Sequence, residues 1–439
     1  MKRFVLICAL LTGSCAPDNT VTIYVTSADE ALLRDGVGFI NDPRLKLVVV
    51  ANPMAKLGSS RSAMEIALTS DARCAECYRL DGRGRQLWVT GGGALGRQYG
   101  VWHALELLGY RFTHPYYTHL PETISPVATQ GHDYAPQIEK RRGLHLHTLH
   151  PTEQYQDFWE PSEVHLDGAK RTVDFLVKNR GNYLQWFALD NIDTDPSQLP
   201  AWQQHTRAIT SFAHAHGVQT GIGFQLFGAS NLQLAFDLID DDTGDVVPEM
   251  ERRLHVLLDG NGFDVLNISF GEFFGAGPDA FVARVNDAYD AMQRVQPNSE
   301  VTATIHVGNY ENLQVTFMGE TLQYYFLVKF ANAAIVPWVH TTMYYDLYED
   351  AGGAYGYDGP FDTHRLYLEQ KLAAGAPAKK VPALRRLITV LCANTSEVSG
   401  FMPSDSSPYA TIVPFWVVSS CSMMFPTTTA RPALGRSSS

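Results

Sequence analysis

Between residues 19 and 117, apolar residues occur in short runs with two different periods. β-Branched runs predict strands, a turn with two glycines predicts a hairpin, and apolar residues three and four apart predict one helix that stops at Gly109. The strands are expected at 21–25 and 45–51, the hairpin at 78–80 and 86–90, and the helix at 94–109. This mixture predicts a small α+β domain over residues 19–117.

From residue 140 to residue 376, strand-like and helix-like patterns alternate regularly. Six strands are expected at 142–148, 183–189, 219–226, 263–270, 301–307 and 334–343. Six helices are expected at 166–178, 201–216, 247–258, 279–295, 322–330 and 363–374. Consecutive strand–helix units predict parallel strands with crossover helices, and six of them favour a barrel over an open sheet. The predicted fold class is therefore α/β, with a small N-terminal α+β domain followed by a (β/α) TIM-type barrel.

Two segments interrupt these patterns. Residues 118–139 contain three prolines and little periodicity, so they are interpreted as a linker. From 377 to 439 the chain has few charges, many Ser and Thr, and no clear strand–helix unit. This atypical tail is interpreted as a divergent, disordered or out-of-frame ending, which leaves the barrel incomplete at its C-terminus.

Residues 1–15 have the order of a bacterial export signal. Two basic residues precede an apolar run at 4–11 that is too short to span a bilayer, and small residues lead to Cys15. The sequence Leu-Thr-Gly-Ser-Cys at 11–15 resembles a lipobox, which implies lipidation of Cys15; secretion without lipid is the alternative. The protein is expected in the cell envelope as a surface lipoprotein, or in the periplasm, with membrane contact only through this lipid.

Composition limits the partners. The 439 residues are 45% hydrophobic and 18% charged, which is enough to bury a large core, and the formal net charge is −12. This negative charge would repel phosphate groups, so nucleic acid is excluded as a partner, whereas a neutral carbohydrate is compatible with it.

Cysteine and histidine do not form a metal-binding pattern. Cys74 and Cys77 form a lone Cys-x-x-Cys pair without a second pair at zinc-site spacing, so a local disulfide or two free thiols are expected. His145 and His147 would share one face of a strand, but no carboxylate accompanies them at close spacing. We therefore expect no metal and no cofactor.

The candidate catalytic groups are carboxylates at predicted strand ends, where the active sites of parallel barrels form. Glu272 follows the fourth barrel strand between a glycine and two phenylalanines. Partial desolvation would raise its pKa, which suits a general acid. Glycosidases commonly use a second carboxylate, for which Asp346 and Asp190 are the candidates.

Other polar and aromatic residues at the strand ends are candidate substrate contacts. Trp338 and Tyr345 have flat faces suited to a sugar ring, although core packing explains each alone equally well. Arg142, Asp190 and His306 complete the predicted substrate-binding set.

Three short stretches resemble a known class of enzyme. Residues 96–105 and 108–112 (GRQYGVWHAL, LGYRF) resemble the end of the small domain that precedes the barrel in β-N-acetylhexosaminidases and α-glucuronidases. Arg141-Arg142-Gly143-Leu144 resembles the first barrel strand of hexosaminidases, and residues 179–186 resemble their second unit. The resemblance implies a carbohydrate-active barrel in which Arg142 binds the terminal sugar.

One departure from the hexosaminidase pattern affects the expected reaction. Those enzymes have an Asp-Glu pair after the fourth strand, whereas this chain has Gly271-Glu272. The acid is matched, but the residue that orients the acetamido group is not. The expected function is a glycoside hydrolase that cleaves O-glycosyl bonds in poly- or oligosaccharides by carboxylate acid/base catalysis. The alternative is a non-catalytic glycan-binding surface lipoprotein.

Overall fold

The computed structural model describes most of the chain from Asp18 onward. The described ranges are 18–71, 74–127, 129–136, 141–146, 153–190, 195–227, 235–239, 245–270, 277–305 and 314–341, with residues 192 and 366 and two short strands at 390–392 and 421–424. The chain divides into two compact units, the first ending at Ala135 and the second beginning at Pro136 apart from residues 112–118, which belong to it.

The first unit is built on a six-stranded sheet whose strands are in the order β2-β1-β3-β5-β4-β8. Their bounds are β1 (Asp18–Val25), β2 (Leu45–Val49), β3 (Ser62–Ser70), β4 (Tyr78–Arg83), β5 (Gln86–Gly91) and β8 (Thr129–Tyr134). The first four strands in this order run parallel, and β4 is antiparallel to both of its neighbours. The predicted strands and hairpin of this region are confirmed.

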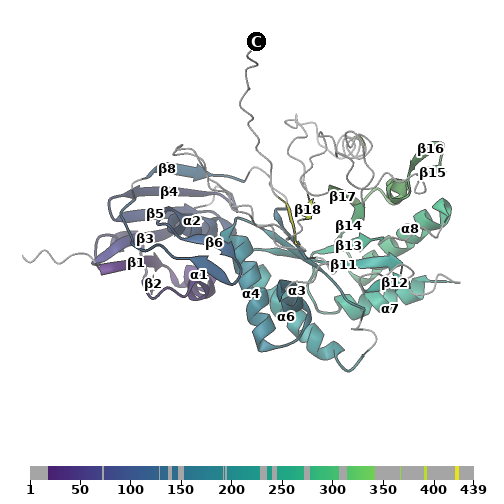
Figure 1. Ribbon diagram of the computed structural model, residues 1–439, viewed down its shortest axis with the longest axis horizontal. Coiled ribbons are helices and arrows are strands. Elements are labelled where there is room, and N and C mark those ends of the chain that lie inside the picture. The colour runs from purple at the N-terminus through teal and green to yellow at the C-terminus, as the bar shows by residue number, and fades with distance from the viewer. Residues whose placement is uncertain are drawn as a thin grey trace, which may run out of the picture. The chain divides into compact units, whose positions relative to one another are not determined.

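Two helices, α1 (Ser27–Ile40) and α2 (Ala94–Leu107), pack beside each other on this sheet (Figure 1). The Thr26 side chain caps α1 by accepting a hydrogen bond from the Asp29 amide, and Asp29 also pairs with Arg97 of α2. A short 3₁₀ helix, η1 (Met54–Lys56), precedes β3. Gly109 has a φ of +99°, so the predicted stop of α2 is a residue in a left-handed conformation.

Part of the segment that was interpreted as a linker is a strand. Residues 129–134 form β8, which pairs with β4, so this part of the interpretation was wrong. β8 carries polar residues that show no strand period, and only its pairing with β4 makes it a strand. Residues 111–119 contain a second small element, the pair β6 (Arg111–His114) and β7 (Tyr117–His119).

The second unit contains the predicted parallel strands. They are β9 (Gly143–Leu146), β10 (Tyr183–Phe187), β11 (Gln219–Phe227), β13 (Val265–Ser269), β14 (Glu300–Ile305) and β17 (Val336–Thr341). Each pairs in parallel with the next, and β12 (Asp237–Ile239) pairs beside the end of β11. The fold class predicted from the sequence, a small α+β domain followed by a TIM-type βα barrel, is confirmed.

Helices follow these strands and lie outside the sheet (Figure 1). They are α3 (Glu153–Trp159), α4 (Glu163–Lys178), α6 (Leu199–Ala215), α7 (Val247–Leu258) and α8 (Pro278–Val295). The predicted helix near 322–330 is confirmed in part. Residues 324–330 form the 3₁₀ helix η4 (Tyr324–Phe330), whereas residues 322 and 323 end the hairpin of β15 (Gln314–Phe317) and β16 (Glu320–Gln323). None of the helices that the structure describes is long and apolar enough to cross a bilayer.

The tail contributes two short strands to the barrel. β18 (Val390–Cys392) is parallel to β17, and β19 (Cys421–Met424) is antiparallel to both β18 and β9. These two strands lie in the segment for which the sequence predicted no clear strand–helix unit. The tail residues that the structure describes contain no helix, so they do not repeat the preceding strand–helix pattern.

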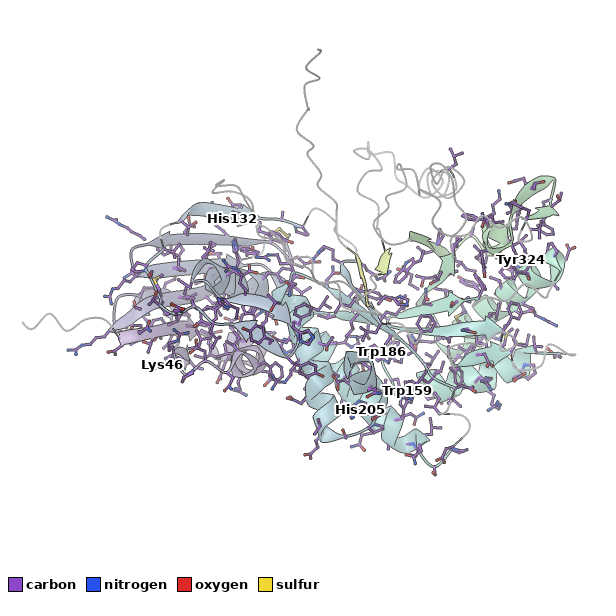
Figure 2. The ribbon with its side chains drawn as sticks, viewed as in Figure 1. Lys46, His132, Trp159, Trp186, His205 and Tyr324 are labelled. Carbon is purple, nitrogen blue, oxygen red and sulfur yellow. A yellow bond between two sulfur atoms is a disulfide. The ribbon has the colours of Figure 1, made fainter. Side chains whose placement is uncertain are left out.

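Aromatic rings join the outer helices to β10. Trp159, Trp186 and His205 lie near one another where α3 and α6 pack on the sheet (Figure 2). Burial lowers the pKa of His205, and its Nε2 donates to the Asp157 carbonyl oxygen at 2.8 Å. These contacts fix the outer face of β10 and leave its alternate residues, such as Tyr183, to face the barrel interior.

Candidate functional site

The carboxyl ends of the parallel strands are the expected location of a site, but several predicted residues lie outside the described part of the chain. These residues are Glu272, His306, Tyr345 and Asp346, together with the predicted lipidation site Cys15. Their roles remain predictions. The described residues that lead to this end of the barrel belong to the strands themselves.

A hydrogen-bonded chain crosses the interior between β10 and β9. Tyr183 donates from its hydroxyl to Gln185 Oε1 at 2.6 Å, and Gln185 Nε2 lies 3.0 Å from His145 Nδ1. Burial raises the pKa of the Tyr183 phenol, which keeps it protonated as a donor. Because Gln185 uses its carbonyl for Tyr183, its amide nitrogen donates to His145, whose Nδ1 is then the acceptor. Neutral His145 therefore carries its proton on Nε2.

Trp338 packs against Tyr183 and His145 from the opposite side of the barrel interior. It projects from β17, is only 6% exposed, and forms a buried cluster with Tyr183 and Val265. Its ring meets Tyr183 edge-on at 5.7 Å and lies 6.2 Å from the His145 ring. Since β17 is not a sheet neighbour of β9 or β10, these contacts span the barrel interior. Packing therefore accounts for Trp338, and its predicted role as a wall of the sugar site stays a prediction.

A second polar network lies between β13 and β14. Asn267 is fully buried and donates from Nδ2 to Thr302 Oγ1 at 2.7 Å, while Thr304 Oγ1 donates to Asn267 Oδ1 at 3.1 Å. Both ends of this amide are thus bonded within the protein. The strand residues cross-link the interior without leaving this polar group unpaired.

Gln225, near the carboxyl end of β11, differs from these amides. It is 2% exposed, and its Oε1 has no hydrogen-bond partner within the described structure. It is outside the predicted set of catalytic and substrate-binding residues. The alternating pattern Gly221-x-Gly223-x-Gln225 is the signal that marks its face of the strand.

Asp190, a predicted substrate contact and candidate second carboxylate, follows β10 and is part of an ion cluster. Arg253 of α7 approaches its Oδ1 with Nη2 at 3.3 Å and also lies 3.1 Å from Asp237 Oδ1. The Arg253 side chain is buried and lies over the Phe236 ring, whereas the side chain of Asp190 is 37% exposed. Asp190 is therefore held by Arg253 and still faces solvent at the end of the barrel where a substrate would enter.

Arg142, the predicted sugar contact, lies at the other end of the barrel strands. It precedes β9, its Nε donates to the Arg180 carbonyl oxygen at 3.0 Å, and its amide donates to Asn182 Oδ1 at 2.7 Å. Both partners belong to the loop that leads into β10. These bonds hold Arg142 to that loop, and its predicted contact with substrate remains a prediction.

The neighbouring Arg141 spans the amino end of the barrel. It forms a paired contact with Glu300, the first residue of β14, with Nη2 to Oε2 at 3.1 Å, and its guanidinium lies 5.0 Å from the centre of the Tyr183 ring. Because β9 and β14 are not adjacent, this ion pair crosses the barrel and closes that end.

The cysteine pair is explained without a metal. Cys74 and Cys77 form a disulfide, and the amide of Gly92 donates to the Cys77 carbonyl oxygen at 2.8 Å. A Cβ atom at Gly92 would lie 1.6 Å from the Cys74 carbonyl oxygen, so only glycine fits beside this loop. Among the residues that the structure describes, no three His, Cys, Asp or Glu side chains gather as metal ligands would.

The parallel barrel strands and the small α+β unit define an α/β protein of the barrel type. No family model matches this chain, and no curated protein matches it. Several solved structures are similar to it, and they are glycoside hydrolases, the class that the sequence resemblance named.

One similar structure is the GH20 exo-β-N-acetylglucosaminidase of Vibrio harveyi in complex with N-acetylglucosamine, with 10% identity, a TM-score of 0.44, and coverage of 74% of this chain and 54% of that one. A second is a mutant β-hexosaminidase of Streptomyces plicatus in complex with product, with 15% identity, a TM-score of 0.49, and coverage of 77% and 74%. A third is a GH138 enzyme targeting pectin rhamnogalacturonan II, with 13% identity, a TM-score of 0.47, and coverage of 80% and 51%. The chain thus spans about half the length of the first and third of these structures.

Proposed function

We propose that this chain is a glycoside hydrolase that cleaves O-glycosyl bonds in poly- or oligosaccharides, with Glu272 as the general acid. The observation that carries the proposal is the position of β13, which lies between β11 and β14 among the parallel barrel strands and ends at Ser269. In such barrels the loops after the strands build the active site. Glu272 follows the last residue of this strand by three positions in the sequence.

Chain length limits the distance between Glu272 and the end of β13. Three residues of extended chain span roughly 10 Å at most, so the Glu272 backbone stays within that distance of Ser269. Phe270 is buried and its ring packs 4.8 Å from Phe281 of α8, which anchors the last described residue before the loop. These facts support an acid at the carboxyl end of the barrel.

Asp190 is the second carboxylate that the described residues support. It lies beyond β10, at the same end of the barrel as Ser269, and Arg253 holds it while part of its side chain remains exposed. An ionised carboxylate so placed would serve as base or nucleophile opposite a protonated Glu272. Asp346 remains the alternative for this role.

The signal-like sequence of residues 1–15 supports a location outside the cytoplasm for this activity. We propose that Cys15 carries a lipid that tethers the enzyme to the cell envelope, where it meets carbohydrate and not nucleic acid. Detergent-phase partitioning of the expressed protein tests the tether, which a Cys15→Ala variant should lose. Partitioning of this variant like the wild type would contradict lipidation at Cys15.

Hydrolysis of a panel of 4-nitrophenyl glycosides by the wild type and by Glu272→Gln tests the proposed reaction. Removal of the acid should lower kcat/KM by about 10²–10⁴-fold on the best substrate. The control is Glu320→Gln, which alters an exposed carboxylate on β16 and should leave kcat/KM unchanged. Full activity of Glu272→Gln would contradict the assignment, and glycan binding without turnover by the wild type would support the non-catalytic alternative.

A further inference from the structure

The inward face of β11 is identified by what its glycines touch. A Cβ atom at Gly221 would lie 2.1 Å from the Tyr183 hydroxyl oxygen, and one at Gly223 would lie 2.9 Å from the Phe187 ring. Tyr183 faces the interior, because it meets Trp338 across the barrel. Since alternate residues of a strand share a face, Gln225 also faces the interior.

Gln225 is the first polar side chain on this face beyond the packed rings. Closer to the amino end of β11, the inward positions are Gly221 and Gly223, and large side chains of β10 fill the space beside them. Gln225 pairs in register with Ser269, the last residue of β13. It therefore lies at the end of the barrel where the candidate acid follows β13.

Three strands carry a buried amide side chain on their inward face: Gln185 on β10, Asn267 on β13 and Gln225 on β11. Gln185 is bonded to Tyr183 and His145 at its two ends, and Asn267 is bonded to two threonines. Gln225, though 2% exposed, has a carbonyl oxygen without a hydrogen bond in the described structure. A buried acceptor without a partner is unfavourable, so a ligand that donates a hydrogen bond to this carbonyl would remove that cost.

The chemistry of this end of the barrel favours a neutral partner. A carbonyl oxygen accepts hydrogen bonds, and the hydroxyl groups of sugars donate them. An anionic sugar would need a cation instead, but Arg253, which projects to this end, already contacts the carboxylates of Asp190 and Asp237.

We propose that Gln225 Oε1 accepts a hydrogen bond from a hydroxyl group of a neutral sugar ring bound at the carboxyl end of the barrel, and so determines which sugar is accepted. The proposal rests on the proposed glycosidase function and specifies its substrate class. A site built to bond one hydroxyl discriminates against sugars that lack it, because the buried carbonyl is then left unpaired.

Affinity measurements on Gln225→Met test this role. The ligands are 4-nitrophenyl glycosides of glucose, galactose, mannose, N-acetylglucosamine and glucuronic acid, with affinity measured by ligand-detected NMR. Methionine keeps the length and removes the acceptor, so the preferred neutral glycoside should bind about tenfold more weakly. The control Gln219→Met makes the same change at the exposed amino end of β11 and should bind like the wild type.

Monodeoxy analogues of the preferred glycoside identify the hydroxyl group. One analogue should bind the wild type about tenfold more weakly and should bind Gln225→Met no more weakly than its parent does. Thermal unfolding separates this role from a structural one: Gln225→Met should keep or raise the Tm, because it removes an unpaired buried acceptor. If Gln225→Met does not fold, Gln225→Glu retains an acceptor and should retain binding.

The failures of the two proposals are distinguishable. Unchanged affinity in Gln225→Met, or a preference for the glucuronide, overturns the role of Gln225 and leaves the hydrolase intact. A loss of Tm in Gln225→Met with unchanged affinity assigns the residue to packing and also overturns it. Absence of binding and turnover with every glycoside overturns the proposed function, and the role of Gln225 with it.

Discussion

The two ends of the barrel use similar polar residues in opposite ways. At the amino end, Arg141 pairs with Glu300 across the barrel and Arg142 bonds the loop before β10. At the carboxyl end, the Gln225 carbonyl oxygen has no hydrogen bond to any residue that the structure describes, and Asp190 stays partly exposed beside Arg253. One end is closed by contacts within the protein, whereas the other retains groups that a ligand can bond.

This difference indicates how stability and function are separated in the fold. Substitutions at the amino end should lower the free energy of unfolding and leave glycoside affinity unchanged, within about twofold, because the Arg141–Glu300 ion pair and the Arg142 hydrogen bond lie at the opposite end of the barrel from Gln225. Substitutions at Gln225 or Glu272 should weaken glycoside binding or turnover and should not lower the free energy of unfolding. Three amino-end variants test this separation, in order of expected effect.

Gly143→Ala should have the largest effect. A Cβ atom there would lie 1.8 Å from the Tyr183 carbonyl oxygen, so the backbones of β9 and β10 would have to separate. We expect a loss of about 3 kcal/mol in the free energy of unfolding, measured by urea denaturation. Gly277→Ala is the control, because nothing lies within 4 Å of its Cβ position and it should change stability little. A Gly143→Ala variant as stable as this control would contradict the close approach.

Tyr183→Phe should have an intermediate effect. It removes the hydroxyl that donates to Gln185 Oε1 and leaves that buried carbonyl short of a partner. The expected loss is about 1–2 kcal/mol in the free energy of unfolding. Tyr289→Phe, on the outer helix α8, removes a half-buried hydroxyl and should change stability little. Equal stability of the two variants would show that the Tyr183–Gln185 bond contributes nothing.

The pair of His214 and Asp264 at the amino end should have the smallest effect, and one that depends on pH. The hydrogen bond that His214 Nε2 donates to Asp264 Oδ2, 2.9 Å away, raises the pKa of His214. Because the folded pKa is raised, the pair stabilises the fold fully below about pH 6.5, the unfolded value, and loses this effect as pH rises through the folded value.

His214→Gln should therefore lose about 0.5 kcal/mol or less at pH 5.5 and almost nothing at pH 9, since both side chains are more than a third exposed and solvent screens them. Unfolding curves at the two pH values measure this difference. In an Asp264→Asn background the same change should show no pH dependence. A stability difference that grows toward pH 9 would contradict the assignment.

Local patterns predicted most helices and strands, but not the role of the residues at each strand end. The helix α7 has the predicted bounds, and the hairpin β4–β5 follows from its turn glycines. Strand β8 was missed because polar residues form it, and its partner β4 is distant in sequence. The bonds of Arg142 to the loop before β10 were not predicted, because a motif gives residue types but not the partners of a side chain.

The residues of the candidate site also divide into those that the sequence indicates and those that only the structure indicates. Glu272, Asp190 and Trp338 were selected as candidates because carboxylates and aromatic rings at strand ends are visible in the sequence. Gln225 was not singled out, because a glutamine after two alternate glycines carries no chemical signal by itself. Only the barrel shows that Tyr183 and Phe187 fill the space at those glycines and that the Gln225 carbonyl oxygen has no hydrogen bond within the described residues.

The sequence by itself determined the strand–helix alternation, the small domain before the barrel, and the export-like start, because each is encoded in residues close together in the chain. The tertiary structure decided which polar residues bond one another and which remain available. That decision depends on strands far apart in sequence, such as β9 with β14 and β10 with β17, whose side chains meet only when the parallel strands curve around a common interior.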